Sequence, residues 1–309
     1  MQKAECSMKK AQNMKTTHLF PTASLALILA FSLQPLALVH AATTITTTNR
    51  YAYAANLGWV DACGDTNNGA VIGEYVCSGY LYAANIGWIN LGSGSPTNGI
   101  WYQNLSANDF GVNLDSSGNL RGYAWGANIG WLNFETTGNP RLSLATGAFS
   151  GYAWSANCGW IGLSTSSGVR TGTIAPAVDS DGDGIADAWE RYYFGNLTTA
   201  NATSDYDHDG MTDRQEYLAG TIPKDANDRP VIVSLTHSAS PPNPHTVLTW
   251  MGHNTRCYQI ERRSALDPAS LWEPISTGNE NVPGWNNASF NDSNPQRLYR
   301  VRVIWPLRP

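Results

Sequence analysis

The stretch "GYAWGANIGWLNF", residues 122–134, is one of four closely similar copies of one phrase in this chain. The other copies are "YAYAANLGWV" from Tyr51, "GYLYAANIGWINL" from Gly79 and "GYAWSANCGWIGL" from Gly151. In the quoted copy Tyr123 and Trp125 alternate with Ala124, Ala127-Asn128 supplies a turn, and a second apolar run follows. A two-residue period interrupted by turn residues is typical of antiparallel β-strands. The copies therefore predict a mainly β fold made of short hairpins.

The spacing of the copies indicates a repeat with one insertion. Their shared tryptophans are separated by 29, 43 and 29 residues, and the long gap contains "GSGSPTNGIWYQNLSANDF". Directly before the third copy, "GVNLDSSGNLRGYAW" predicts a further hairpin with its loop at Asp115–Gly118. A single hairpin is unstable in water, but four hairpins can share one core. The pattern leaves a solenoid, a small propeller and a sandwich all open.

The aromatic residues of the copies have two interpretations. We expect most of the rings to form a packed face, because the intervening alanines allow a neighbouring sheet to approach closely. The alternative is a row of exposed rings that stack on sugars. Charged residues are scarce here, with six acidic and four basic residues between residues 42 and 173. In the insertion, Trp101 and Tyr102 are the pair that we expect to be exposed.

The phrase resembles a Gly-Tyr-Ala-Trp…Asn-Ile-Gly-Trp repeat of secreted proteins from Gram-negative bacteria. The resemblance covers residues 51–163. It implies an extracellular location and does not imply an activity.

Two acidic segments carry the strongest chemical signal in the sequence. "DSDGDGIADAWE", residues 179–190, and "DYDHDGMTDRQE", residues 205–216, both match the spacing of a calcium-binding loop. In such a loop alternate carboxylates, one backbone carbonyl and a final glutamate surround a hard cation. The predicted ligands of the first ion are Asp179, Asp181, Asp183, the Ile185 carbonyl, Asp187 and Glu190. Those of the second are Asp205, Asp207, Asp209, the Met211 carbonyl, Asp213 and Glu216.

The net charge of this region also favours bound cations. Residues 177–228 contain twelve acidic and three basic residues, a density that repels itself without a cation. The alternative is a solvated acidic linker without a metal. One short helix is predicted after each loop, ending at Gly195 and at Gly220, where glycine provides a C-terminal cap.

The calcium segments resemble the loops of dockerins and thrombospondin type 3 repeats, and bacterial surface spacers of the same type. The resemblance implies a calcium-binding, EF-hand-like spacer. Such spacers commonly have an aspartate before the proline of their last motif, where this chain has Ile222. Any additional ligand from that position is therefore in doubt.

Residues 1–41 have the pattern of a secretory signal peptide. Four lysines precede the apolar run "ASLALILAFSLQPLALV", and small residues suited to cleavage end at Ala41. The apolar run is short for a membrane span, and Pro35 interrupts it. Beyond residue 41 the chain carries 15 basic and 23 acidic residues, which argues against a nucleic-acid partner.

The cysteines are consistent with an oxidising compartment. Cys63, Cys77, Cys158 and Cys257 allow three pairings if all four form disulfides. Cys63 and Cys77 enclose a turn-rich segment and are the first choice. A Cys77–Cys158 disulfide is the alternative. Cys158 occupies the position of Leu57, Ile86 and Ile129 in the other copies, where a buried apolar side chain is also expected.

The last part of the chain predicts six short strands, which suggests a β-sandwich. The runs "CYQIERRS" and "RLYRVRVIW" resemble paired strands of fibronectin type III-like domains, over about residues 230–306. His237, His245 and His253 lie at eight-residue spacing, and we expect them on separate strands or loops rather than in one metal site.

The predicted organisation is a signal peptide (1–41), an aromatic β-repeat domain (42–172), a calcium-binding spacer (173–229) and a β-sandwich (230–309). No catalytic motif occurs, and we expect no enzyme activity. A glycosidase would have to use Glu74 or Glu135 with Asp61, Asp65, Asp109 or Asp115. The expected function is a secreted calcium-binding structural or adhesive protein with two ions. The first alternative is a carbohydrate-binding protein with exposed rings, and the lesser one is a polysaccharide hydrolase or its accessory chain. A polysaccharide or envelope surface is the expected partner, and self-assembly stays open.

Overall fold

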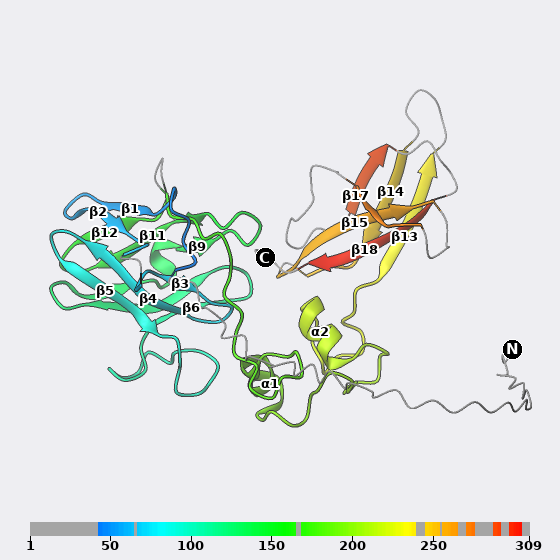
Figure 1. Cartoon of the computed structure of the whole chain (residues 1–309), viewed down its shortest axis with the longest axis horizontal. Coiled ribbons are helices and arrows are strands. Elements are labelled where there is room, and N and C mark those ends of the chain that lie inside the picture. The colour runs from blue at the N-terminus through cyan, green and yellow to red at the C-terminus, as the bar shows by residue number, and fades with distance from the viewer. Residues whose placement is uncertain are drawn as a thin grey trace, which may run out of the picture. The chain divides into compact units, whose positions relative to one another are not determined.

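The computed structural model describes residues 43–64, 67–164, 168–238, 245–253, 255–264, 270–275, 287–291 and 297–304 (Figure 1). The predicted signal peptide lies outside these residues. The described chain is mainly β, with two short α-helices, which confirms the predicted class. Among the described residues no helix has the length and apolarity to cross a membrane.

Four hairpins close into an antiparallel barrel of eight strands. Each hairpin carries one copy of the phrase and pairs with the next, and the last strand, β12, pairs with the first, β1. The structure is therefore a barrel, and none of the three arrangements considered from the sequence. The strands are β1 Tyr51–Ala54, β2 Gly58–Asp61, β4 Cys77–Ala83, β5 Gly87–Ser93, β7 Leu120–Gly126, β8 Gly130–Asn133, β11 Tyr152–Ser155 and β12 Gly159–Gly162.

The interior of the barrel is filled by small and aliphatic side chains. Ala124 and Ala153 are fully buried, and across the hairpins they pair with Leu132 and Ile161, which are also buried. The expectation that the aromatic rings form the packed face is wrong, because the interior of an eight-stranded barrel is narrow and side chains of modest size already fill it. Alternation then places the tyrosine and tryptophan rings of the strands on the outer face, while Phe134 at the end of the third copy is buried in the core. The shared tryptophans are 41–54% exposed: Trp59, Trp88, Trp131 and Trp160.

The outer rings pair across the strands of each hairpin. Tyr53 lies opposite Trp59 with ring centroids 5.1 Å apart, and Trp125 lies opposite Trp131 at 4.8 Å. Both pairs are edge-to-face, a favourable geometry for aromatic rings worth about 0.5–1.5 kcal/mol beyond area burial. These pairs stabilise each hairpin from its solvent side, while alanine leaves room for the facing aliphatic residues inside.

A ring of asparagine side chains joins the four hairpin turns at one end of the barrel. The Nδ2 group of each turn asparagine donates to a backbone carbonyl in the turn of the neighbouring copy. The ring closes because the first copy bonds back to the fourth. The four bonds are Asn56 to Cys158 (3.1 Å), Asn85 to Leu57 (3.1 Å), Asn128 to Ile86 (2.9 Å) and Asn157 to Ile129 (3.0 Å). The invariant asparagine of the phrase therefore has a specific role in closure.

Short elements flank the barrel. β6 (Val112–Leu114) pairs with β7, with a turn in which the Gly118 amide donates to the Asp115 carbonyl, and this confirms the hairpin predicted there. β3 (Val71–Ile72) pairs with β4, and β9 (Arg141–Leu142) pairs with β10 (Phe149–Ser150). A 3₁₀ helix spans Thr136–Gly138.

The insertion between the second and third copies is anchored by Tyr102. This side chain is 2% exposed, so the prediction that it would be exposed is wrong. Its ring lies against Gly111, where an added Cβ would come within 2.2 Å of the ring. Its hydroxyl donates to the Cys77 carbonyl at 3.1 Å and accepts from the Gly94 amide at 2.5 Å. Gly92 and Gly111 make room for the ring. These glycines are the signal in the sequence that is consistent with a buried Tyr102. Trp101 is 40% exposed, as predicted.

Asp109 holds the same insertion through charge. It is buried, and its two oxygens accept from the amides of Thr97 and Gln103, both at 3.1 Å. Burial alone would raise the pKa of Asp109, but these hydrogen bonds leave the pKa below its usual value.

We expect acid to release the insertion. A carboxyl whose folded pKa is lowered adds stability above its unfolded pKa of about 4, and that contribution is lost as the pH falls through the folded pKa. An NMR titration of the Thr97 and Gln103 amides should show them shifting together below about pH 4. In Asp109→Asn these shifts should be absent, and persistence of the same titration in that variant would assign it to another group.

The four cysteines of the described chain are buried free thiols, and no disulfide joins them within it. The predicted Cys63–Cys77 disulfide and its Cys77–Cys158 alternative are therefore not formed. Burial raises the pKa of Cys77 to about 12 and that of Cys257 to about 11, so both behave as apolar side chains. Cys158 is 3% exposed in the barrel core, which confirms the apolar interpretation.

The two helices follow the acidic loops as predicted. α1 spans Asp187–Phe194 and α2 spans Asp213–Ala219. Gly195 and Gly220 follow them in the left-handed conformation, at φ 75° and 78°, and cap them. Thr212 and Gln215 form a capping box at the start of α2, which fixes where this helix begins.

The last part of the chain contains two three-stranded antiparallel sheets. All six predicted strands are present, and the six form the orders β13-β14-β17 and β16-β15-β18. A cluster of buried residues that includes Leu248 and Ile260 comes from both sheets. The strands are β13 Ile232–Ser238, β14 His245–Trp250, β15 Cys257–Arg263, β16 Glu273–Pro274, β17 Asn287–Asn291 and β18 Leu298–Ile304.

Candidate metal centres

The first acidic loop gathers three carboxylates around one point. Asp179, Asp181 and Asp183 each offer an oxygen, and these atoms lie within 4.8 Å of one another. The chain turns tightly because Gly184, at φ 88°, donates its amide to Asp179 at 2.9 Å, and the Ile185 amide donates to Asp183 at 2.8 Å. The turn therefore brings the three carboxylates close to one point.

Glu190 completes this loop from the first turns of α1. Its side chain is fully buried, and neither carboxylate oxygen has a hydrogen-bond partner among the described residues. Asp183 Oδ2 is also buried without such a partner. A buried carboxylate without a partner is costly, so its charged form is disfavoured unless a ligand or a proton compensates it. The pKa of Glu190 rises to about 7, first through burial and then through the negative charges of Asp183 and Asp181.

The second loop repeats the arrangement. Ligand atoms of Asp205, Asp207 and Asp209 lie within 4.8 Å of one another, and each residue has one buried oxygen unpaired within the described chain. Glu216 on α2 is fully buried, and its Oε2 likewise has no partner there, while its Oε1 accepts from the Thr221 hydroxyl at 3.3 Å. Burial and then the charges of Asp207 and Asp209 raise the pKa of Glu216 to about 8.

The predicted ligands Asp187 and Asp213 have a different position. Asp187 accepts from the amide and hydroxyl of Ser180 at 2.8–3.0 Å, and from Arg191 at 3.2 Å. Asp213 accepts from the Ser204 hydroxyl at 2.5 Å and from the Tyr206 amide at 3.1 Å. The structure thus brings these two carboxylates to the start of each loop and outside the two acidic triads. Their observed role is to hold the loop ends together, which the motif alone did not indicate.

The remaining predicted ligands are two backbone carbonyls. The amides of Ile185 and Met211 donate to the third aspartate of their own loops, at 2.8 and 2.7 Å, which places each residue directly beside its triad. Their carbonyls stay predicted ligands. The Ile185 side chain is fully buried with Trp189 and Tyr217 in a small core that supports both loops.

The donor set fits calcium. All the convergent groups are oxygens, which favours a hard cation, and cysteine and histidine are absent from both described triads. Buried unpaired carboxylate oxygens in both loops supply the negative charge that such a cation neutralises. The three C-terminal histidines take no part: His237 contacts the Thr246 hydroxyl at 3.0 Å, His253 contacts Asp228 at 3.0 Å, and His245 begins β14.

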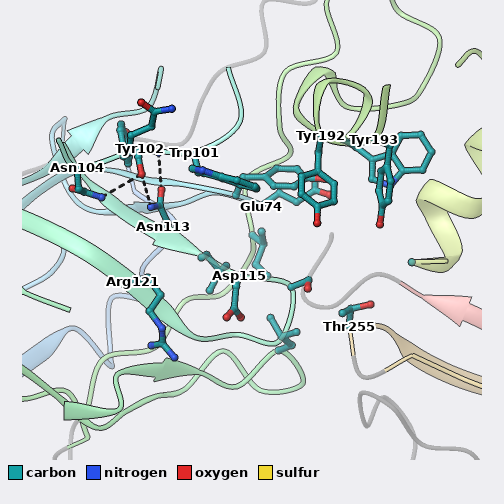
Figure 2. A pocket seen from close by; sticks show the side chains of 18 of the residues that line it. Glu74, Trp101, Tyr102, Asn104, Asn113, Asp115, Arg121, Tyr192, Tyr193 and Thr255 are labelled. Carbon is teal, nitrogen blue, oxygen red and sulfur yellow. Dashed lines mark hydrogen bonds between the residues drawn. The ribbon is translucent and has the colours of Figure 1, made fainter. Parts of the chain in front are cut away.

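A second feature was not found from the sequence. A cavity of about 1020 Å³ is lined by residues of the barrel, its insertion and α1, including Trp101, Tyr192 and Asp115 (Figure 2). Its walls come from segments about 90 residues apart, and no short motif joins them. The exposed Trp101 was the one signal in the sequence that pointed to it.

Comparison with protein-family models, curated proteins and solved structures found no match to this chain.

Proposed function

We propose that the two acidic loops bind two calcium ions, and that the protein is a secreted structural or adhesive protein whose spacer is ordered by them. The observation that carries the proposal is the set of buried, unpaired carboxylate oxygens centred on Glu190 and Glu216. Each glutamate lies in the first turn of a helix that packs into the shared core around Trp189. A cation that holds the glutamate therefore fixes the helix, and with it the core.

The cellular setting is part of the same proposal. The signal-like residues 1–41 support export, and extracellular calcium modules bind at about 0.1–1 mM, in keeping with the calcium level outside cells. The last two sheets support a sandwich of the fibronectin type III kind, because residues of both contribute to one buried cluster. We propose that this part serves attachment.

Calcium titration tests the proposal. By isothermal calorimetry the full chain should bind two calcium ions. About 10 mM calcium, which is about 10–100 times the expected dissociation constant, should raise the stability by about 1.4–2.7 kcal/mol per ion over excess chelator, and therefore by about 3–5 kcal/mol for two ions. Magnesium should be a weaker substitute, because it demands a smaller octahedral shell. Equal stability in calcium and in chelator would overturn the proposal.

A second candidate function is carbohydrate binding. The observation that favours it is the exposure of aromatic rings that were expected in the core. The rings on the barrel form edge-to-face pairs on an outward-curving surface, which offers a saccharide little enclosure. The cavity beside Trp101 offers more enclosure.

A further inference from the structure

The cavity has an aromatic wall made by two separate segments. Trp101 of the insertion contacts Tyr192 of α1, with ring centroids 5.5 Å apart, and Tyr193 continues the wall at 4.8 Å from Tyr192 (Figure 2). Trp101 and Tyr192 are 40% and 55% exposed, so they present ring surface to whatever enters. Concave sites that combine ring surface with a few polar groups are the usual binding sites for small organic ligands.

Hydrogen-bonding groups border the same space. Figure 2 shows the hydroxyls of Tyr192 and Tyr193 pointing into the cavity, with Asp115 across from them. Glu74, which accepts from the Tyr217 hydroxyl at 3.0 Å, and Glu135, which accepts from the Gly122 amide at 2.8 Å, also line it. An ionised carboxylate has about four acceptor positions, so these groups can accept further bonds from ligand hydroxyls.

The charge of the lining favours a neutral ligand. Glu74, Asp115 and Glu135 contribute three carboxylates, against Arg121 and Arg256. Arg256 is buried, and it donates to the carbonyls of Tyr217 at 2.7 Å and Leu218 at 2.9 Å. The carboxylates would repel uronic acids or phosphates. Sugar rings with apolar faces and many hydroxyls match ring surface and acceptors together.

We propose that this cavity binds a segment of a neutral polysaccharide, with sugar rings against Trp101 and Tyr192, and that the two calcium loops preorganise its walls. Saccharide binding in this cavity rests on the second candidate function, carbohydrate binding, and specifies its site and ligand class. The calcium dependence rests on the proposed calcium sites.

The calcium loops reach the cavity by two routes. In the first, Glu190 lies on α1 two residues before Tyr192, so a cation that holds Glu190 fixes the helix that carries the wall. In the second, Glu216 is followed directly by Tyr217, whose hydroxyl donates to Glu74 in the cavity lining. Both routes are short and pass through buried residues.

Trp101 is positioned without calcium. The Asn98 side chain accepts from the amides of Ile100 at 2.8 Å and Trp101 at 3.0 Å, and the rest of the insertion is held by Asp109 and Tyr102 as described above. One wall is therefore fixed by the barrel and the other by calcium. Removal of calcium should weaken binding, because the mobile wall then has to be ordered on binding.

Affinity electrophoresis of the full chain tests this. Native gels would contain hydroxyethyl cellulose, galactomannan, laminarin or polygalacturonate, with about 2 mM calcium or excess chelator. We expect at least one neutral polysaccharide to retard the chain and polygalacturonate to leave it unaffected. Trp101→Ala and Tyr192→Ala should each weaken retention about tenfold or more, as loss of a ring anchor does. Trp101→Phe should keep most of the retention, which would show that the insertion folds in this variant.

Trp59→Ala is the matched control, because Trp59 is an exposed indole of the barrel outside the cavity lining. It should keep full retention. The proposal is overturned if no neutral polysaccharide retards the chain, if polygalacturonate does so instead, or if Trp59→Ala loses as much as Trp101→Ala. If calorimetry shows no calcium binding while Trp101-dependent retention persists in chelator, the calcium function fails and the saccharide site stands. If calcium binds but retention is the same in chelator, the coupling alone fails.

Discussion

Glu216→Gln should lower the calcium affinity of the second loop by roughly 100-fold or more, because even groups behind the ligands change metal affinity by about 10–100-fold. The substitution keeps the shape of the side chain and removes the charge that closes the loop. At about 1 mM calcium, calorimetry should then find one ion per chain in place of two.

The same variant should have the opposite effect without calcium. Glu216 is fully buried beside Asp207 and Asp209, and both burial and these charges disfavour its ionised form. In chelator the neutral amide of the variant avoids this cost. We expect the melting temperature of Glu216→Gln to lie below that of the native chain in calcium, and at or above it in chelator.

The control is Glu135→Gln. This glutamate lies outside both loops and accepts one amide hydrogen bond, which glutamine can also accept. It should leave both calcium sites intact. Two full sites in Glu216→Gln would refute the assignment of this residue as a ligand.

Gly151→Ala should destabilise the barrel by about 2–5 kcal/mol. Gly151 begins the fourth copy at φ 78°, in the left-handed region, which costs about 1–2 kcal/mol for another residue. In addition, an alanine Cβ would lie 2.1 Å from the Asn139 carbonyl oxygen and 2.7 Å from that of Gly138. Both are backbone atoms that a rotamer change cannot move, and such overpacking adds about 1–3 kcal/mol.

Gly159→Ala in the same copy separates the two contributions. It has a similar φ of 74°, but the nearest atom to its Cβ would be 3.6 Å away, so it should cost the conformational part of about 1–2 kcal/mol alone. Urea unfolding followed by tryptophan fluorescence measures both variants. Equal losses would show that the close approach at Gly151 relaxes at no cost.

The local elements were predictable from the sequence because local rules determine them. Alternation set the strands, the D-x-D-x-D-G spacing set the acidic triads, and Gly195 and Gly220 ended the helices as expected. The side of the sheet on which the rings lie was not predictable. A two-residue period identifies two faces, but the choice between them depends on the width of the interior, and that depends on closure between Ala54 and Ile161, more than 100 residues apart.

The sites show the same division. Asp179 and its partners are close in sequence, so their convergence follows from the loop itself. Tyr102 appeared to be an exposed insertion residue, since the glycines that accommodate its ring lie in other segments. The bracing role of Asp187 depends on Ser180, seven residues earlier, through a bond that the calcium motif does not specify. In both cases the missing information was a specific side-chain contact that the local pattern does not specify.

The ring of asparagines also limits how this protein can vary in length. In an open stack of repeats, duplication of one unit lengthens the stack by one repeat, and the terminal repeats have a distinct capping form. Here Asn56 of the first copy bonds to the fourth, so each copy has a neighbour on both sides and there is no end at which to add another. A fifth hairpin would require a wider barrel, and the alanines inside would no longer meet the facing aliphatic residues. Additional length can be accommodated between copies, as in the segment that carries Trp101, so the long insertion of this chain and its proposed binding wall coincide.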